Sequence, residues 1–430
     1  SQEQKSMNVL VIGNGAREHV LCENLNSSNK VNEVFVAPGN GGTSECAVNL
    51  SINSDDVSGL LSFAKSNDID LTVVGPEIPL SLGIVDVFEA NNLNIFGPTK
   101  SAAQIESSKL FAKNLMVKIG VPTADFCVVE DYNQVDKGTF GFGPPYVIKA
   151  DGLAAGKGVA IADTFDEASL LLRSHLVDKT FGSASEKVIV EQFLLGREIS
   201  VFGFVDGSSV SSLTAACDYK KLHDGNRGPN TGGMGGYSPP ESILWNKNIE
   251  NWVMDNVMQP VVDELKNRGT PYKGVLYAGL IKTQDGLKVL EFNCRFGDPE
   301  AQIIIPRIEN DLIDVINDVV AETIKPQSVI WNCRSSVGVV IVSKGYPEKY
   351  EVGHEIKGID LLDDNVQVFH AGTMLKVAEN ENLLQTSGGR VITVVSKDKD
   401  VNIARDNVYR NISRINFNGA TFRHDIALLN

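Results

Sequence analysis

The sequence has few cysteines, no long apolar run and no basic run, and each absence excludes a class of protein. The six cysteines among 430 residues are scattered and form no C-x-x-C pair. We therefore expect free thiols in a reducing compartment, and neither a disulfide framework nor a zinc site. No apolar run approaches the ~20 residues that span a bilayer. Residues 1–6 are polar and lack the apolar core of a signal peptide, so we expect a cytoplasmic protein with no membrane partner.

The charge balance argues against nucleic acid as a partner. The contents of 22% charged and 42% hydrophobic residues are those of an ordinary soluble globular protein. The net charge is −15 and there is no basic run, so nucleic acid is not expected as a partner. Local basic groups can still hold a small anionic substrate inside an acidic protein. The length is that of roughly three domains.

The first hundred residues alternate short apolar strands with helical stretches. The predicted strands cover residues 8–12, 33–37, 71–74 and 94–96, and each ends at a Gly/Pro turn. This pattern predicts a parallel α/β sheet with its ligand at the carboxyl ends of the strands. The first turn reads Gly13-Asn14-Gly15-Ala16-Arg17-Glu18.

That turn does not match the dinucleotide-binding fingerprint. Glu18 stands where G-x-G-x-x-G requires a third glycine, and the second strand runs into Pro38 without the acidic residue that would bind ribose. Two interpretations remain open: a phosphate-sized anion site with Arg17 beside it, or a purely structural strand–helix turn.

A glycine-rich loop, residues 152–158, joins predicted strands at 146–151 and 159–161. Such a loop can fold over phosphates as a flap, and Lys149 on the entering strand can reach their oxygens. It is not a Walker A loop, because Gly158 follows Lys157 where Ser or Thr is required. The alternative is a flexible hairpin with two lysines. Lys109 lies in a predicted helix over 101–118, where a solvated lysine is the usual case.

Two further stretches have the composition of binding segments. The strand predicted at 187–192 is followed by Phe193 and Leu194, on which a nucleotide base could lie, with Glu198 taking the ribose hydroxyls; the alternative is two packed strands and a surface glutamate. Residues 215–240 are rich in glycine and predict a long irregular loop. Its backbone N–H groups could surround an oxyanion.

Residues 288–300 carry the densest set of polar groups. Glu291 and Asn293 share one face of a predicted strand at 288–292, and each offers the oxygen ligand that Mg²⁺ prefers. Arg295 can hold a carboxylate or phosphate, and Glu300 follows a Gly-Asp-Pro turn. The alternative is a solvated edge strand. A strand at 274–282 should pair with it in antiparallel fashion through an Asp-Gly turn.

The rest of the chain predicts further helices and strands without a catalytic constellation. Helices are expected at 249–268, 311–324 and 401–412, and strands at 336–343 and 391–395. The last hundred residues are typical of a closing α/β domain.

Taken together, the motifs resemble the ATP-grasp superfamily and, within it, the phosphoribosylamine–glycine ligases of purine biosynthesis. The matching stretches are VIGNGAREH, APGN, VVGPEIPL, IFGPT, IKADGLAAGKGV, GPNTGGMGGYSP, LYAGL and EFNCRFGDPE. The resemblance implies an N-terminal Rossmann-like domain (7–106), an ATP-grasp domain (107–330) with a flap at 125–196, and a C-terminal α/β domain (331–430). It also implies that ATP, glycine and 5-phosphoribosylamine give glycinamide ribonucleotide, ADP and phosphate.

The resemblance also implies a role for individual residues. Glu291 and Asn293 would hold Mg²⁺ or Mn²⁺. ATP would be bound by Lys109, Lys149, Gly152, Gly156, Lys157, Gly158, Glu191, Gln192, Phe193, Leu194 and Glu198. Phosphoribosylamine and glycine would be bound by Gly13, Asn14, Gly15, Arg17, Glu18, Gly39, Asn40, Pro76, Glu77, Asp298 and Glu300. Catalysis would involve Asp218, Asn230, Thr231, Gly232, Gly233 and Arg295.

One departure from the wider superfamily concerns the metal. Many ATP-grasp enzymes have another acidic ligand on the strand that reads here Tyr277-Ala278-Gly279-Leu280, which leaves the ligands of a second ion open. Two rival functions also stay open: an ATP-grasp ligase for another acid–amine pair, and a nucleotide-binding protein without ligase activity. We expect a monomer or a weak homodimer.

Overall fold

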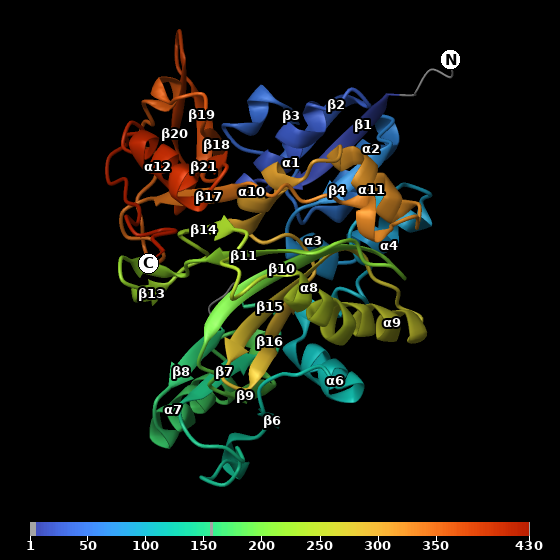
Figure 1. The fold of residues 1–430 in the computed structure, drawn as a ribbon, viewed down its shortest axis with the longest axis vertical. Helices are drawn as coiled ribbons and strands as arrows, with labels where there is room; N and C mark the ends of the chain where they lie inside the picture. Colours follow the sequence, from blue (N-terminus) through green and yellow to red (C-terminus); the bar gives the residue numbers. More distant parts are fainter. Residues whose placement is uncertain (1–5, 155–157, 430) are drawn as a thin grey trace.

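The computed structural model describes residues 6–154 and 158–429, and its first sheet is parallel, as predicted (Figure 1). The strand order is β3-β2-β1-β4-β5. Its strands are β1 (Met7–Gly13), β2 (Val31–Pro38), β3 (Val48–Asn49), β4 (Leu71–Val74) and β5 (Ile95–Phe96). The helical segments between them are α1 (Ala16–Asn26), η1 (Thr43–Glu45), α2 (Val57–Ser66), α3 (Glu77–Ser81) and α4 (Ile84–Ala90).

The composition of β1 explains why this sheet lies inside the protein. Residues 9–12 of β1 are fully buried, because side chains on both faces of a parallel sheet pack against other elements. The strand order reverses at β1, which lies between β2 and β4. In such sheets, ligands bind at the carboxyl ends of the strands beside this switch point. The turns after β1 and β4 are therefore the part of the domain that faces the candidate site.

A second, four-stranded antiparallel sheet has the order β6-β9-β7-β8 and lies at the lower end of the molecule in Figure 1. Its strands are β6 (Phe126–Val129), β7 (Tyr146–Ala150), β8 (Val159–Ala162) and β9 (Val188–Gln192). Its helical segments are η2 (Tyr132–Gln134), α7 (Phe165–Leu176) and η3 (Gly182–Ser185). Helix α7 covers one face through Ala168 and Leu172, which pack with Ile148. The glycine-rich loop joins β7 to β8.

The third sheet has the order β16-β15-β10-β11-β14-β17-β21-β18 and extends across the middle of the molecule. Its strands are β10 (Arg197–Asp206), β11 (Thr214–Asp218), β14 (Gly235–Ser238), β15 (Lys273–Thr283), β16 (Gly286–Asn293), β17 (Ser335–Val342), β18 (Gln367–His370) and β21 (Arg390–Asp398). Strands β15 and β16 pair antiparallel, as predicted. Residue 330, the predicted domain boundary, lies between strands of this one sheet.

The remaining elements connect or cover these sheets. The helical segments are α5 (Gln104–Ser107), α6 (Lys109–Ile119), α8 (Lys247–Val253), η4 (Met254–Met258), α9 (Gln259–Asn267), α10 (Glu300–Ile304), η5 (Ile305–Arg307), α11 (Leu312–Val320), η6 (Pro326–Ser328), η7 (Ile359–Leu361) and α12 (Val401–Ile412). Two ribbons pair β12 (Lys221–His223) with β13 (Arg227–Asn230), and β19 (Thr373–Val377) with β20 (Asn382–Thr386).

Two secondary-structure predictions were wrong. Residues 215–240 are not a long irregular loop, because they contain β12, β13, β14 and most of β11. Glycine is required in β14 by close packing: a Cβ on Gly236 would overlap the carbonyl oxygen of Cys217 in β11. The helix predicted over 101–118 divides at Ser108, whose side chain accepts a hydrogen bond from the Phe111 N–H (3.1 Å) and caps a new helix, α6.

In the described residues, no helix is long and apolar enough to cross a membrane. The predicted domain limits at 106/107 and 330/331, and the flap limits at 125–196, remain predictions.

Candidate active site

The N-terminus of α1 is built around the Glu18 side chain, which explains the glycines of the first turn. A Cβ on Gly13 or Gly75 would overlap the Glu18 carboxylate. Glu18 Oε2 accepts a hydrogen bond from the Gly15 N–H (3.2 Å) and so caps the helix. These glycines accommodate a buried carboxylate of the protein. This packing gives the glycines a structural reason, and the role of Gly13 and Gly15 in substrate binding stays a prediction.

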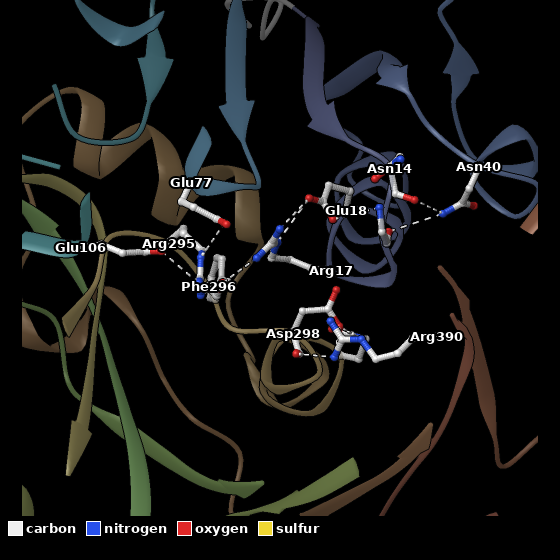
Figure 2. A network of polar contacts seen from close by, with 12 residues as sticks. Asn14, Arg17, Glu18, Asn40, Glu77, Glu106, Arg295, Phe296, Asp298 and Arg390 are labelled. Carbon is white, nitrogen blue, oxygen red and sulfur yellow. Dashed lines mark hydrogen bonds and ion pairs between the residues drawn. The ribbon is translucent and has the colours of Figure 1, made fainter. Parts of the chain in front are cut away.

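Arg17 is held by the protein on both sides. Its guanidinium donates to Glu18 Oε1 (3.1 Å) and to the carbonyl oxygen of Phe296 (3.1 Å), as Figure 2 shows. The residue is only 9% exposed. The N–H of Arg17 donates to the Asp298 carboxylate. In this structure the carboxylate at the N-terminus of α1 belongs to Asp298 of the protein, and the phosphate site beside Arg17 stays a prediction.

The Asn40 side chain connects the N-terminal sheet with β18. Its amide donates to the carbonyl oxygens of Asn14 (3.0 Å) and His370 (2.7 Å). Asn14 is exposed and Gly39 is half-buried. Asn40 therefore orders the loop after β1, while Asn14 offers a side chain to solvent beside it (Figure 2).

Arg390, on β21, was missed by the sequence analysis. Its Nη1 donates to the carbonyl oxygens of Asp298 (2.8 Å) and Gly233 (3.4 Å), so it joins the turn after β16 to the segment before β14 (Figure 2). Its Nη1 also lies 3.8 Å from Asp298 Oδ1. In the sequence, Arg390 follows Gly388 and Gly389, a pattern that indicates a turn and does not predict these contacts.

Arg295 lies just beyond the end of β16 and is surrounded by acidic groups. Its Nε lies 3.3 Å from Glu77 Oε2 and its Nη2 lies 3.1 Å from Glu106 Oε2. Burial opposes the charge, but Glu106 and Glu77 together raise the pKa of Arg295. Glu106, also missed from the sequence, accepts from the Cys294 N–H (2.8 Å). Pro76 is the N-cap of α3, whose first residue is Glu77. The carboxylates of Glu77 and Glu106 hold the guanidinium just beyond the end of β16 (Figure 2).

The predicted metal ligands both come from the last three residues of β16. Strand β16 carries Glu291 and Asn293, and no described residue donates a hydrogen bond to the Glu291 carboxylate. Glu291 is exposed overall; partial loss of hydration opposes its ionisation, but Lys149, Lys220 and Lys109 outweigh this effect and lower the pKa of Glu291. An ionised carboxylate without a protein donor, next to an amide oxygen, fits a hard cation.

The neighbouring strand supplies no further ligand. Gly279 of β15 lies directly opposite Glu291 in the register, which is where a second carboxylate would face it. The described ranges, 6–154 and 158–429, contain no group of three or more His, Cys, Asp and Glu side chains that could hold a metal. Phosphate oxygens of a bound nucleotide would have to complete the shell of any cation on this strand.

Asp218, Lys220 and Glu300 form a charged cluster between β11 and α10. Lys220 Nζ lies 3.0 Å from Asp218 Oδ2, and Asp218 raises the pKa of Lys220. Glu300, the first residue of α10, is 3% exposed. Burial, reinforced by the charge of Asp218, raises the pKa of Glu300 to about 7. The cluster therefore holds a carboxyl group that changes charge near neutral pH.

The segment before β14 does not form the predicted ring of free N–H groups. The N–H of Thr231 donates to the Lys220 carbonyl (2.7 Å), that of Gly232 to the Tyr346 hydroxyl (2.9 Å), and that of Gly233 to the Thr231 hydroxyl (3.0 Å). These three donors have protein acceptors, so the hypothesis that they surround an oxyanion does not hold in this structure. Asn230, the last residue of β13, is exposed.

On the nucleotide side, Lys149 and Glu191 are in contact. Lys149 Nζ lies 2.9 Å from Glu191 Oε2. Lys113 Nζ, from α6, lies 3.0 Å from the other carboxylate oxygen. The sequence analysis missed Lys113, although it lies one helical turn after Lys109 and therefore on the same face of α6.

The glycine-rich loop is fastened to the start of α6. The Asp151 carboxylate accepts from the Ser108 hydroxyl (3.0 Å) and the Leu110 N–H (2.8 Å), and Lys109 Nζ donates to the Gly152 carbonyl (3.3 Å). Gly158 closes the loop by accepting from the Ala150 N–H (2.8 Å). The predicted ATP-binding residues Gly156 and Lys157 lie outside the described residues.

The segment that follows β9 continues the nucleotide side. Gln192 is the last residue of β9, and its N–H donates to the carbonyl of Asp125 (2.8 Å). Phe193 and Leu194 are half-buried, and Glu198, in β10, is exposed. The structure thus brings one predicted set of residues together around β7, β9 and β16, and the other around the ends of β1 and β4.

The chain is similar to known proteins over almost its whole length. Family models described as phosphoribosylglycinamide synthetase match residues 7–106 (N domain), 107–301 (ATP-grasp A domain) and 336–429 (C domain). The chain belongs to the phosphoribosylglycinamide synthetase family. It is 44% identical to the phosphoribosylamine–glycine ligase of Caldanaerobacter subterraneus subsp. tengcongensis, over 98% of this chain and 99% of that one.

Two further relatives are a longer, trifunctional protein and a protein of known structure. The trifunctional purine biosynthetic protein adenosine-3 of Gallus gallus is 43% identical over 97% of this chain, which covers 42% of that protein. The crystal structure of phosphoribosylamine–glycine ligase from Thermotoga maritima has a TM-score of 0.82 and 30% identity, covering 98% of this chain and all of that one. Biotin carboxylase from Campylobacter jejuni, at 14% identity and a TM-score of 0.70, shares the fold.

Proposed function

We propose that this phosphoribosylglycinamide synthetase joins glycine to 5-phosphoribosylamine with ATP, and that β16 and the turn after it form the boundary between the two halves of the site. The observation that carries the proposal is the order of groups along ten residues. Glu291 and Asn293 lie on the nucleotide side with Lys149, and Asp298 lies at the N-terminus of α1. One rigid strand end therefore faces both the phosphoryl donor and the amine acceptor.

ATP would bind between the four-stranded sheet, which contains β7 and β9, and the β16 edge of the eight-stranded sheet. Lys109 and Lys149 would pair with its phosphates, and the loop over 152–158 would cover them. The backbone after Glu191 would face adenine, with Phe193 and Leu194 against the base and Glu198 at the ribose. Glu291 and Asn293 would hold Mg²⁺, or Mn²⁺ in its place, which neutralises charge on the phosphates.

The cluster of Asp218 and Glu300 would bind glycine through its ammonium group. Two carboxylates suit a cation of that size, and the glycine carboxylate could then point toward β16. One oxygen of the glycine carboxylate attacks the γ-phosphorus of ATP and ADP leaves, which gives glycyl phosphate. Positioning and charge neutralisation account for this step without a protein nucleophile.

The ends of β1 and β4 would bind phosphoribosylamine, with Glu77 and Asn14 at its rim. Its amine attacks the acyl carbon of glycyl phosphate, phosphate leaves, and the nitrogen loses a proton. Closure of the loop over 152–158 would protect the acyl phosphate from water.

The test is phosphate release from ATP with Mg²⁺ or Mn²⁺, omitting glycine and freshly made phosphoribosylamine in turn. We expect release only when both are present. Release with another amino acid but not with glycine would overturn the substrate while keeping the ATP-grasp mechanism. ATP binding without any release would overturn the ligase reaction.

A further inference from the structure

Glu191 is shared by two lysines from different elements. Lys149 comes from β7 and Lys113 from α6, and each approaches one oxygen of the Glu191 carboxylate, at 2.9 and 3.0 Å respectively. All three side chains are nearly inaccessible: relative exposure is 8% for Lys149, 2% for Lys113 and 3% for Glu191. Of the two cations, Lys149 has the larger opening toward solvent.

The Lys113 ammonium group has three partners within the protein. It lies 3.0 Å from the Glu191 carboxylate, it donates to the Thr123 hydroxyl (2.6 Å), and it lies 5.4 Å from the centre of the Phe126 ring in a cation–π contact. Thr123 in turn donates to the carbonyl oxygen of Val289 (2.7 Å), two residues before Glu291 on β16. These contacts fix the position of the ammonium group; burial lowers the pKa of Lys113, and the charge of Glu191 opposes that effect.

The charges of this triad do not balance. Two cations face one carboxylate, so one positive charge is left without a partner inside the protein. The next acids felt by Lys149 are Glu291 and Glu198. Glu291 is the expected metal ligand, and Asp125, the further acid felt by Lys113, is exposed and screened by solvent.

We propose that Lys113 is a positioning residue for ATP: by occupying one oxygen of Glu191, it keeps Lys149 from being neutralised and leaves the charge of Lys149 for a nucleotide phosphate. This rests on the proposed function only in placing ATP at Lys149. Without Lys113, Lys149 and Glu191 would form a self-satisfied pair. The positive charge of Lys149 therefore stays available for an anion, because Lys113, which does not contact the ligand, neutralises part of the Glu191 carboxylate.

The test compares charge variants by their affinity for Mg²⁺-ATP, measured by calorimetry without glycine or phosphoribosylamine. K113M should weaken binding by about tenfold or more, since a charge-assisted contact is lost to the ligand, and the loss should shrink at high salt. K113R keeps the charge and should stay near wild type. K118M, which removes an exposed α6 lysine paired with Glu264, is the matched control and should bind normally.

The decisive variant is the double substitution K113M/E191Q. It removes one cation and one anion, so it restores the surplus charge carried by Lys149. We expect it to bind Mg²⁺-ATP several-fold more tightly than K113M. If Lys113 acts only by packing, the double variant will bind as weakly as K113M or more weakly, and the proposal is wrong. It is also wrong if K113M binds like wild type.

Folding is checked by thermal midpoints for every variant, and the K113R and double variants keep the comparison informative if K113M alone is unstable. The outcome is separate from that of the ligase proposal. A wild-type protein that binds ATP without ligating glycine would overturn the proposed reaction and leave the charge comparison intact.

Discussion

Replacing Glu300 by glutamine should make the protein more stable at alkaline pH and a poorer enzyme. Burial, with help from Asp218, raises the pKa of Glu300 from 4.5 to about 7. The ionised carboxylate is therefore destabilised in the folded protein. Glutamine has nearly the same shape and resembles the protonated acid, so E300Q removes this unfavourable charge while keeping the packing at the start of α10.

The magnitude follows from the pKa difference. One pKa unit corresponds to 1.36 kcal/mol, so ionising Glu300 in the folded state costs about 3 kcal/mol above pH 7. The pKa of Glu300 is higher in the folded protein than in the unfolded chain. The protonated acid therefore keeps the wild type at its full stability below pH 4.5. This stability is lost as pH rises from 4.5 to 7. The advantage of E300Q should be about 1 kcal/mol at pH 5.5 and about 3 kcal/mol at pH 8.

The assay is the free energy of unfolding in urea, or the thermal midpoint, of both proteins between pH 5.5 and 8.5. In parallel, the KM for glycine should rise in E300Q, because the proposed site for the glycine ammonium loses one carboxylate. In the wild type, the KM for glycine should fall as pH rises through 7, because Glu300 then becomes ionised. A stability gap that does not change with pH would refute the assigned ionisation. A normal KM for glycine in a more stable E300Q would refute the proposed glycine site.

Three other changes test separate parts of the site. E291Q should lower kcat by about a hundredfold or more, because charge neutralisation at the phosphates is lost, while the circular dichroism spectrum stays unchanged; near-normal kcat would overturn the metal assignment. R390Q should lower kcat about tenfold, because it removes the hydrogen bonds from the guanidinium to the carbonyl oxygens of Gly233 and Asp298, which join two segments of the site. A variant with the kcat of the wild type would show that these hydrogen bonds do not order the site. G75A should overlap the Glu18 carboxylate and destabilise the fold by about 1–3 kcal/mol, whereas G143A, where a Cβ has nothing within 4 Å, should not; equal thermal midpoints would contradict the packing argument.

Local sequence patterns determined most elements of this fold. The apolar run of β1 and the glycine that ends it predicted a parallel strand, because a strand buried on both faces needs apolar residues on both. The spacing of Glu291 and Asn293 placed both on one strand, and the order of the motifs indicated the family. Glycine content was misleading over 215–240, since glycine permits close pairing of strands as readily as it permits loops.

Tertiary structure alone decided which charged groups meet. The contacts of Lys113 with Glu191, of Glu106 with Arg295 and of Arg390 with Asp298 could not be predicted from local patterns, because each joins residues 78 or more positions apart in the chain. A buried charge is defined by its surroundings rather than by its neighbours in sequence. The sequence therefore predicted the strands that carry the site, whereas only the packing of three sheets showed that Arg17 and Arg295 are already paired within the protein and that Lys149 shares its carboxylate with Lys113.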